Sequence, residues 1–226
     1  MVRVKGRREL ICWNKYFGDA LFSRRPSAGD AFRSLFVPSF RPAMTTQTDL
    51  QTYAIDASHS RLGFAVRHLG FSKVRGSFEQ FEGTLRMAEG DLASLEAEAT
   101  VQTSTITTNN GPRDEHLRGS DFFLVEEHPT ITFTSTGVRD VNGDAFMLAG
   151  DFTMRGVTKP VELKAEFLGA GVDPWGNRKV AFEGRTTINR KDFGLNWNAA
   201  LETGGFLVSD DVEIVIEVQA ALQTEG

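Results

Sequence analysis

Apolar and polar side chains alternate with a period of two residues along most of the chain after residue 60. Such a period places successive side chains on opposite faces of a strand, so each segment predicts a strand with one apolar and one solvated face. In "LEAEATVQT", for example, Leu95, Ala97, Ala99 and Val101 share one face. The pattern predicts eight strands, at residues 61–68, 76–87, 95–103, 130–136, 146–154, 161–168, 180–188 and 212–222.

Short turn sequences separate several of these segments. "VNGD" at 141–144 is the strongest, because Asn142-Gly143 tolerates the positive φ angles of a tight hairpin turn. Long strands joined by short turns predict an antiparallel barrel or sandwich and argue against parallel β-α-β units. The long connection at 107–123 differs, because Asn109 or Asn110 can cap a short helix with Pro112 in its first turn.

The predicted apolar faces combine phenylalanine with small residues such as Ala97, Ala99, Gly150, Ala165 and Gly184. The chain holds 18 Phe and only 2 Tyr, and phenylalanine has no polar group, so this bias favours a fully apolar interior. An eight-stranded barrel is just wide enough to be filled by side chains or to hold one slender ligand. The small residues favour a cavity.

Charge is distributed unevenly along the chain. Residues 1–43 carry nine basic and three acidic side chains, a net charge of +6, so the remaining residues carry −11 of the total of −5. An acidic body is a poor binder of polyanions, which argues against a nucleic-acid partner. The single cysteine, Cys12, excludes an internal disulfide and a multi-cysteine metal site.

Residues 1–43 show no clear strand or helix periodicity and no continuous apolar run of the kind found in secretory signals. Three interpretations remain: sequence translated upstream of the true start at Met44, a basic disordered arm, or a targeting segment. We expect residues 44–226 to form the folded domain.

Five common catalytic or cofactor-binding signatures are missing: the sequence contains no GxSxG, HExxH, CxxC, Walker A or GxGxxG motif. "RDEHLRGSD" at 113–121 offers Asp114 and His116 as acid–base groups, or alternatively a charged, solvated helix with pairs such as Asp114–Arg118. The row of Leu62, Phe64 and Val66 ends at His68, which is either a contact for a ligand head group, a partner in a loop hydrogen bond, or a catalytic or metal-binding group.

Six ordered segments resemble the YceI-like family of lipocalin-like barrels. They cover residues 53 to about 222 and read "YAIDASHSRLGFAVRHLGFSKVRGSFEQFEGTL", "TSTITTNNGPRDEHLRGSDFF", "HPTITFTST", "LAGDFTMRGVTKPVEL", "DPWGN" and "INRKDFGLNWN".

The resemblance implies an all-β, extended, eight-stranded antiparallel barrel with a short helix in one long connection. Its interior is expected to bind a long-chain isoprenoid or quinone-like lipid, with no catalysis, cofactor or metal ion. Members are commonly exported in bacteria and often dimeric, which implies a homodimer and transient membrane contact. Because no signal peptide is recognisable, we expect a cytoplasmic location, with the periplasm as the alternative.

Ligand contacts are assigned by position in these segments. We expect His68 and Arg75 near a head group, and the helix-bearing loop with Phe122 and Phe123 as the gate. The predicted walls are Phe64, Val66, Phe78, Phe81, Leu85, Ile131, Phe133, Phe152, Phe182, Leu195, Trp197 and Ile214. A register slip of one residue would exchange the inner and outer rows.

Two other hypotheses stand beside lipid binding. One is an enzyme at the barrel mouth that acts on a lipid-like substrate through His68, Asp114 or His116. The other is a barrel with a filled core and no ligand.

Overall fold

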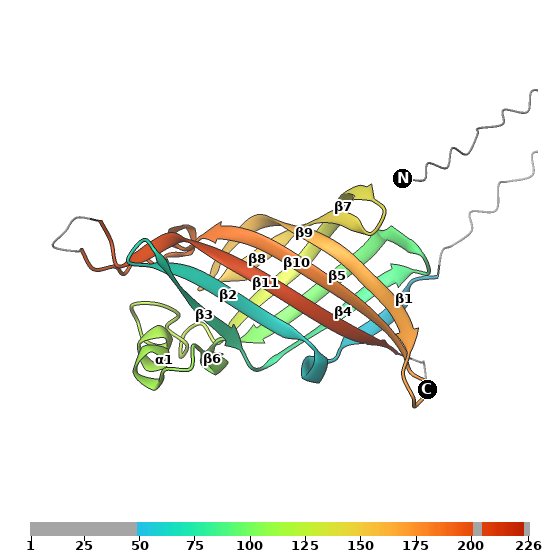
Figure 1. The fold of residues 1–226 in the computed structure, drawn as a ribbon, viewed down its shortest axis with the longest axis horizontal. Helices are drawn as coiled ribbons and strands as arrows, with labels where there is room; N and C mark the ends of the chain where they lie inside the picture. Colours follow the sequence, from blue (N-terminus) through green and yellow to red (C-terminus); the bar gives the residue numbers. More distant parts are fainter. Residues whose placement is uncertain (1–48, 201–204, 224–226) are drawn as a thin grey trace, which may run out of the picture. The chain divides into compact units, whose positions relative to one another are not determined.

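The structure is a computed structural model that describes residues 49–200 and 205–223, so the predicted extension at 1–43 lies outside the described residues (Figure 1). Eleven strands and one α-helix make up most of this part of the chain. The strands are β1 (Gln51–Ile55), β2 (Arg61–His68), β3 (Ser72–Phe78), β4 (Phe81–Ala88), β5 (Asp91–Gln102), β6 (Ile106–Thr107), β7 (Thr130–Asn142), β8 (Ala145–Met154), β9 (Val157–Val172), β10 (Arg178–Asn189) and β11 (Val208–Leu222); the helix is α1 (Gly111–Arg118), and the 3-10 turns are η1 (Ala57–His59), η2 (Thr103–Thr105) and η3 (Arg190–Phe193).

All strand pairs are antiparallel, and β11 closes the sheet into a barrel. Its end, Ala220–Leu222, pairs with β1, while Val208–Glu217 pairs with β2. β1 and β2 therefore lie on the same side of β11, one after the other along its length. β4 pairs with β1, and β3 pairs with β2. The barrel ring is β1-β4-β5-β7-β8-β9-β10-β11, which confirms the predicted eight-stranded antiparallel barrel with one helix.

The predicted strand at 76–87 is wrong in its boundaries. The structure contains two strands there, because β3 ends at Phe78 and β4 begins at Phe81. β3 also begins at Ser72 and not at the predicted residue 76, so only Leu69–Phe71 connects it to β2. Gly76 interrupts the apolar row of β3, which weakened the alternation in the sequence.

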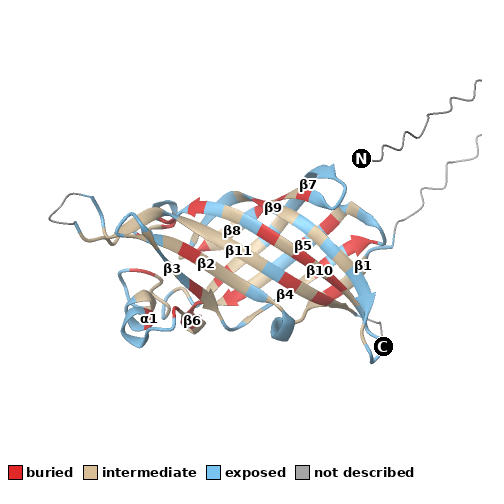
Figure 2. Ribbon diagram, viewed as in Figure 1, coloured by how far each residue is buried: buried red, intermediate tan, exposed pale blue. Residues whose placement is uncertain are grey.

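Burial alternates along the strands, as the period of two requires (Figure 2). The inward side chains form two buried clusters. One is centred on Tyr53, Phe146 and Phe182, and the other on Ile131 and Phe193.

Helix α1 begins as the sequence predicts. Asn110 is its N-cap and accepts a hydrogen bond from the backbone N–H of Arg113 at 3.1 Å, with Pro112 in the first turn. The long connection that contains α1 joins β6 to β7.

Two inward glycines make room for aromatic rings of neighbouring strands. A Cβ atom on Gly150 would overlap the ring of Phe133 and lie 2.7 Å from the carbonyl oxygen of Thr134, and a Cβ on Gly76 would meet the ring of Phe64 in the same way. The space that these glycines leave is therefore filled by phenylalanine. At Gly184, by contrast, the nearest atom is Cδ2 of Leu163 at 3.4 Å.

This difference gives a matched pair of substitutions. We expect Gly150→Ala to lower the free energy of unfolding by about 1–3 kcal/mol, because the Thr134 carbonyl belongs to the sheet and cannot move aside. Gly184→Ala is expected to change it by less than about 0.5 kcal/mol. Urea denaturation of both variants checks this, and equal destabilisation would contradict the packing described.

Candidate functional site

The barrel interior holds two cavities that share part of their walls. The inner cavity has a volume of about 180 Å³ and the outer cavity about 410 Å³. Because the same side chains border both, the two cavities adjoin inside the barrel. The shared residues are Phe64, Phe78, Ile131, Phe152, Ile188 and Ile214.

The two cavities follow one another along the strands. On β11, Val208 and Val212 line the outer cavity, Ile214 lines both, and Ile216 and Val218 line the inner one. The outer cavity therefore lies toward the start of β11, and the inner cavity toward its end, where β1 closes the barrel.

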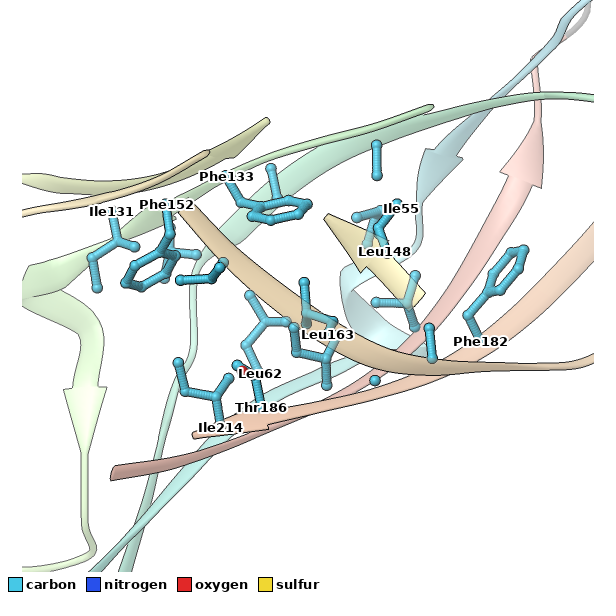
Figure 3. Close-up of a pocket in the computed structure, with 18 of the residues that line it drawn as sticks. Ile55, Leu62, Ile131, Phe133, Leu148, Phe152, Leu163, Phe182, Thr186 and Ile214 are labelled. Carbon is cyan, nitrogen blue, oxygen red and sulfur yellow. The ribbon is translucent and has the colours of Figure 1, made fainter. Parts of the chain in front are cut away.

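The inner cavity is almost entirely apolar. Thr186 contributes a hydroxyl among aliphatic and aromatic side chains (Figure 3). Two carboxylates among the lining residues pair on the outside of the barrel, Glu98 with Arg86 and Glu183 with Arg185. Such a wall stabilises a hydrocarbon segment and offers very little to a polar one.

Packed side chains close the far end of the inner cavity. Tyr53, Met87, Val180 and Ala220 belong to the buried cluster there, and all are at most 5% exposed. None of them lines the cavity. We therefore expect a ligand to reach this end from the outer cavity.

An aromatic cluster borders the outer cavity. The ring centroid of His116 lies 5.1 Å from that of Phe122 and 4.8 Å from that of Trp197, both edge to face, and Phe122 is tilted against Trp197 at 5.3 Å. Phe123 meets Phe78 edge to face at 5.8 Å. The loop after α1 is thereby attached through its aromatic rings to β3 and to the segment around Trp197.

Basic side chains line the outer cavity, and no carboxylate residue is among those described as lining it. The four are His68, Arg113, His116 and Arg190. His116 Nε2 lies 2.8 Å from Asp121 Oδ2, and Arg113 donates through Nε to Thr108 Oγ1 at 2.6 Å. The basic side chains that line the interior therefore lie at this end.

Arg190 is a buried cation that holds the loop between η3 and β11. Only 3% of it is exposed, and it donates to the carbonyl oxygens of Leu195, Trp197 and Ser209. Burial lowers the pKa of Arg190, and its ion pair with Asp210 partly offsets this effect. Its donors are occupied in fixing Leu195 and Trp197 at the cavity wall.

Asp114 anchors α1 and does not line either cavity. Its Oδ1 accepts hydrogen bonds from the hydroxyl and backbone N–H of Thr108, and its Oδ2 accepts one from Thr107. Although burial alone raises the pKa of Asp114, these hydrogen bonds outweigh burial and leave the pKa below its ordinary value. The exposed Asp114–Arg118 pair is therefore wrong; Arg118 instead donates to the carbonyl oxygens of Ser104 and Ile106.

The structure places most predicted contact residues at the cavities. The inner cavity is lined by Leu85, Phe133 and Phe182 in addition to the shared Phe64, Phe78, Ile131, Phe152 and Ile214; the outer cavity is lined by Val66, His68, Phe122, Phe123, Leu195 and Trp197.

Arg75 and Phe81 line neither cavity. Arg75 is exposed, because it lies between the inward residues Val74 and Gly76 of β3. Phe81 packs against the second buried cluster, next to the break between β3 and β4.

Several lining residues were missed. Ile188 and Val212 stand in rows that the alternation had already shown, so the signal for them was present. Arg113 and Leu117 reach the outer cavity only through the placement of α1, which no local pattern reveals.

The part of the chain that the structure describes contains no group of three His, Cys, Asp or Glu side chains arranged to hold a metal ion. None of its helices is long and apolar enough to span a membrane.

Comparison with known proteins agrees with this architecture. A UPF0312 protein of Pseudomonas paraeruginosa is 39% identical over 173 residues, which cover 76% of this chain and 87% of that protein. The crystal structure of a Campylobacter jejuni YceI protein matches with a TM-score of 0.61 and 28% identity, over 70% of this chain and 90% of that one.

A polyisoprenoid binding domain from Saccharophagus degradans also shares the fold, with a TM-score of 0.56 and 16% identity, over 76% of this chain and 99% of that domain. The family model for the YceI-like domain matches residues 53–220, which begin within β1 and end at Ala220 in β11. The chain therefore belongs to the YceI-like domain family.

Proposed function

We propose that the protein binds one long-chain isoprenoid or quinone-like lipid, without catalysis, and carries or stores it. The end of the tail occupies the inner cavity, and the rest of the tail and the head group extend into the outer cavity. The observation that carries this proposal is the order of the two adjoining cavities, an apolar one closed at its far end and a larger one with basic side chains.

The cavity dimensions favour a slender ligand. The inner volume of about 180 Å³ is below the roughly 300–1,000 Å³ of pockets for compact small molecules, whereas the outer volume of about 410 Å³ lies within that range. A ligand with a narrow apolar chain at one end and a larger polar group at the other matches the volumes of the inner and outer cavities.

Apolar contacts alone supply enough free energy. Burial of one CH₂ group contributes about 0.8 kcal/mol, so a five-carbon isoprene unit contributes roughly 2–4 kcal/mol before the cost of ordering the chain. A few buried units therefore give tight binding without a specific polar contact. The polyisoprenoid binding domain from Saccharophagus degradans, which shares this fold, supports the same ligand class.

Catalysis by His68, Asp114 and His116 is the less favoured alternative. Asp114 accepts hydrogen bonds from Thr107 and Thr108 and does not itself line either cavity. His116 is held between Asp121 and Trp197. We propose that the two histidines contact the head group and that Asp114 only positions the helix.

Native mass spectrometry of protein purified without denaturants tests the proposal. We expect a bound species of lipid mass in wild type and a large loss of occupancy in Ala165→Phe, whose added ring would enter the inner cavity that Ala165 lines. Lys164→Phe is the matched control, because it adds the same ring to the exposed face of the same strand. A lipid-free wild type from a lipid-replete host, or equal occupancy in both variants, would contradict the proposal.

A positioning role for Asp114 predicts a pH-dependent effect on stability. The pKa of Asp114 in the folded protein lies below its unfolded value, so its contribution is full above that unfolded value and is lost as pH falls through the folded pKa. We expect Asp114→Asn to lower the free energy of unfolding by about 1–3 kcal/mol at neutral pH, and the difference from wild type to shrink as the pH falls below 3.8, the ordinary pKa of an Asp side chain.

Chemical denaturation across this pH range measures the difference, with lipid occupancy of the folded variant recorded in parallel. If Asp114→Asn were as stable as wild type at neutral pH, the anchoring role would be wrong.

A further inference from the structure

One rim of the barrel exposes large apolar side chains beside the outer cavity. Phe71, in the turn between β2 and β3, is 79% exposed, and Phe206, just before β11, is 61% exposed. The backbone N–H of Leu69 donates to the carbonyl oxygen of Leu207 at 2.9 Å, so the two segments lie side by side (Figure 1). His68 and Leu207, the residues next to Leu69 and Phe206, line the outer cavity.

The turn between β2 and β3 contains a residue type that is unfavourable for its backbone conformation. Leu69 adopts a left-handed conformation with φ of +53°, followed by Gly70 at +77°. Leucine is disfavoured in this region, where glycine or asparagine is the usual choice, as at Gly143 between β7 and β8. Leu69 is nevertheless 37% exposed, so burial in the barrel core does not explain its presence.

The hairpin behind this turn is basic. Between residues 57 and 78 the chain has no Asp or Glu, and its four Lys and Arg side chains, Arg61, Arg67, Lys73 and Arg75, are all exposed. Arg67 lies directly opposite Lys73 in the strand register, an arrangement of like charges that weakens a hairpin.

The carboxylates that face this hairpin come from β11. Glu213 accepts a hydrogen bond from Lys73 at 2.6 Å, and Glu217 lies opposite Arg61 in the register. Arg67 and Arg75 form no salt bridge with any side chain that the structure describes. The outer face of the hairpin therefore keeps a positive charge.

We propose that this rim, defined by Leu69, Phe71 and Phe206 with Arg67 and Arg75 behind them, docks on the surface of an anionic phospholipid bilayer. Apolar side chains at a tip enter the interface, while basic side chains behind them meet the anionic head groups. The proposal rests on the proposed function, since docking here brings the outer cavity to the bilayer from which a lipid tail would enter.

The opposite end of the barrel also exposes a large aromatic side chain, which can be compared with Phe71. Trp175, in the turn between β9 and β10, is 83% exposed, and this turn lies near the end of β11, because Lys179 pairs with Ala221. The rim lies near the start of β11, where His68 pairs with Val208, roughly 40 Å away along the strand. Packed side chains separate that end from the inner cavity.

Sedimentation with vesicles of equal parts phosphatidylcholine and phosphatidylglycerol tests the docking. We expect wild type to bind these vesicles, more weakly at high salt, and Phe71→Ser to bind them about tenfold more weakly. Leu69→Gly should also weaken binding while the protein becomes more resistant to urea, because glycine relieves the left-handed strain. A purely structural role for Leu69 would not produce these opposite changes.

Trp175→Ser is the matched control and should bind vesicles as wild type does. Docking is overturned if wild type does not bind the vesicles, or if Phe71→Ser and Leu69→Gly bind as well as wild type. Native mass spectra of the same preparations separate the two proposals, because a protein that docks but never carries lipid contradicts the proposed function alone.

Discussion

The pairing of β11 with two successive segments, β1 and β2, is the constraint on which the interior depends. The end of β11 closes the ring through β1, while its first part extends along β2 beyond that closure. This shared position continues the row of inward side chains on β11 from the closed end to the basic end. A single wall thereby borders both cavities, and the polarity of the interior changes along it.

Much of the fold could be predicted because alternation is a local signal. The strands from β7 to β11 show it with few interruptions and were predicted from it. β1, one of the eight strands of the ring, was not predicted, and the choice of a barrel over a sandwich came from the family resemblance. The break between β3 and β4 was missed because Gly76 and Gly83 carry no apolar side chain, so one uneven strand fitted the pattern as well as two.

The site was harder to predict, because its polar half depends on contacts between distant segments. The role of Asp114 in anchoring α1 depends on its hydrogen bonds with Thr107 and Thr108, and the sequence alone does not show that these residues lie beside it. Arg190 pairs with Asp210 rather than with a neighbour in its own segment. An inward glycine does not by itself predict a cavity. The space beside Gly150 is occupied by the ring of Phe133, whereas Gly184 lines the inner cavity.

The central claim is that the ligand lies with its tail toward the closed end and its head group toward the basic end. The most direct measurement is a crystal structure of the protein loaded with a polyprenyl alcohol that carries bromine at the end of its tail. The anomalous signal of bromine is expected in the inner cavity, near Phe182 and Gly184. A bromine signal in the outer cavity, beside His116 and Trp197, would contradict the orientation and with it the account of the two cavities.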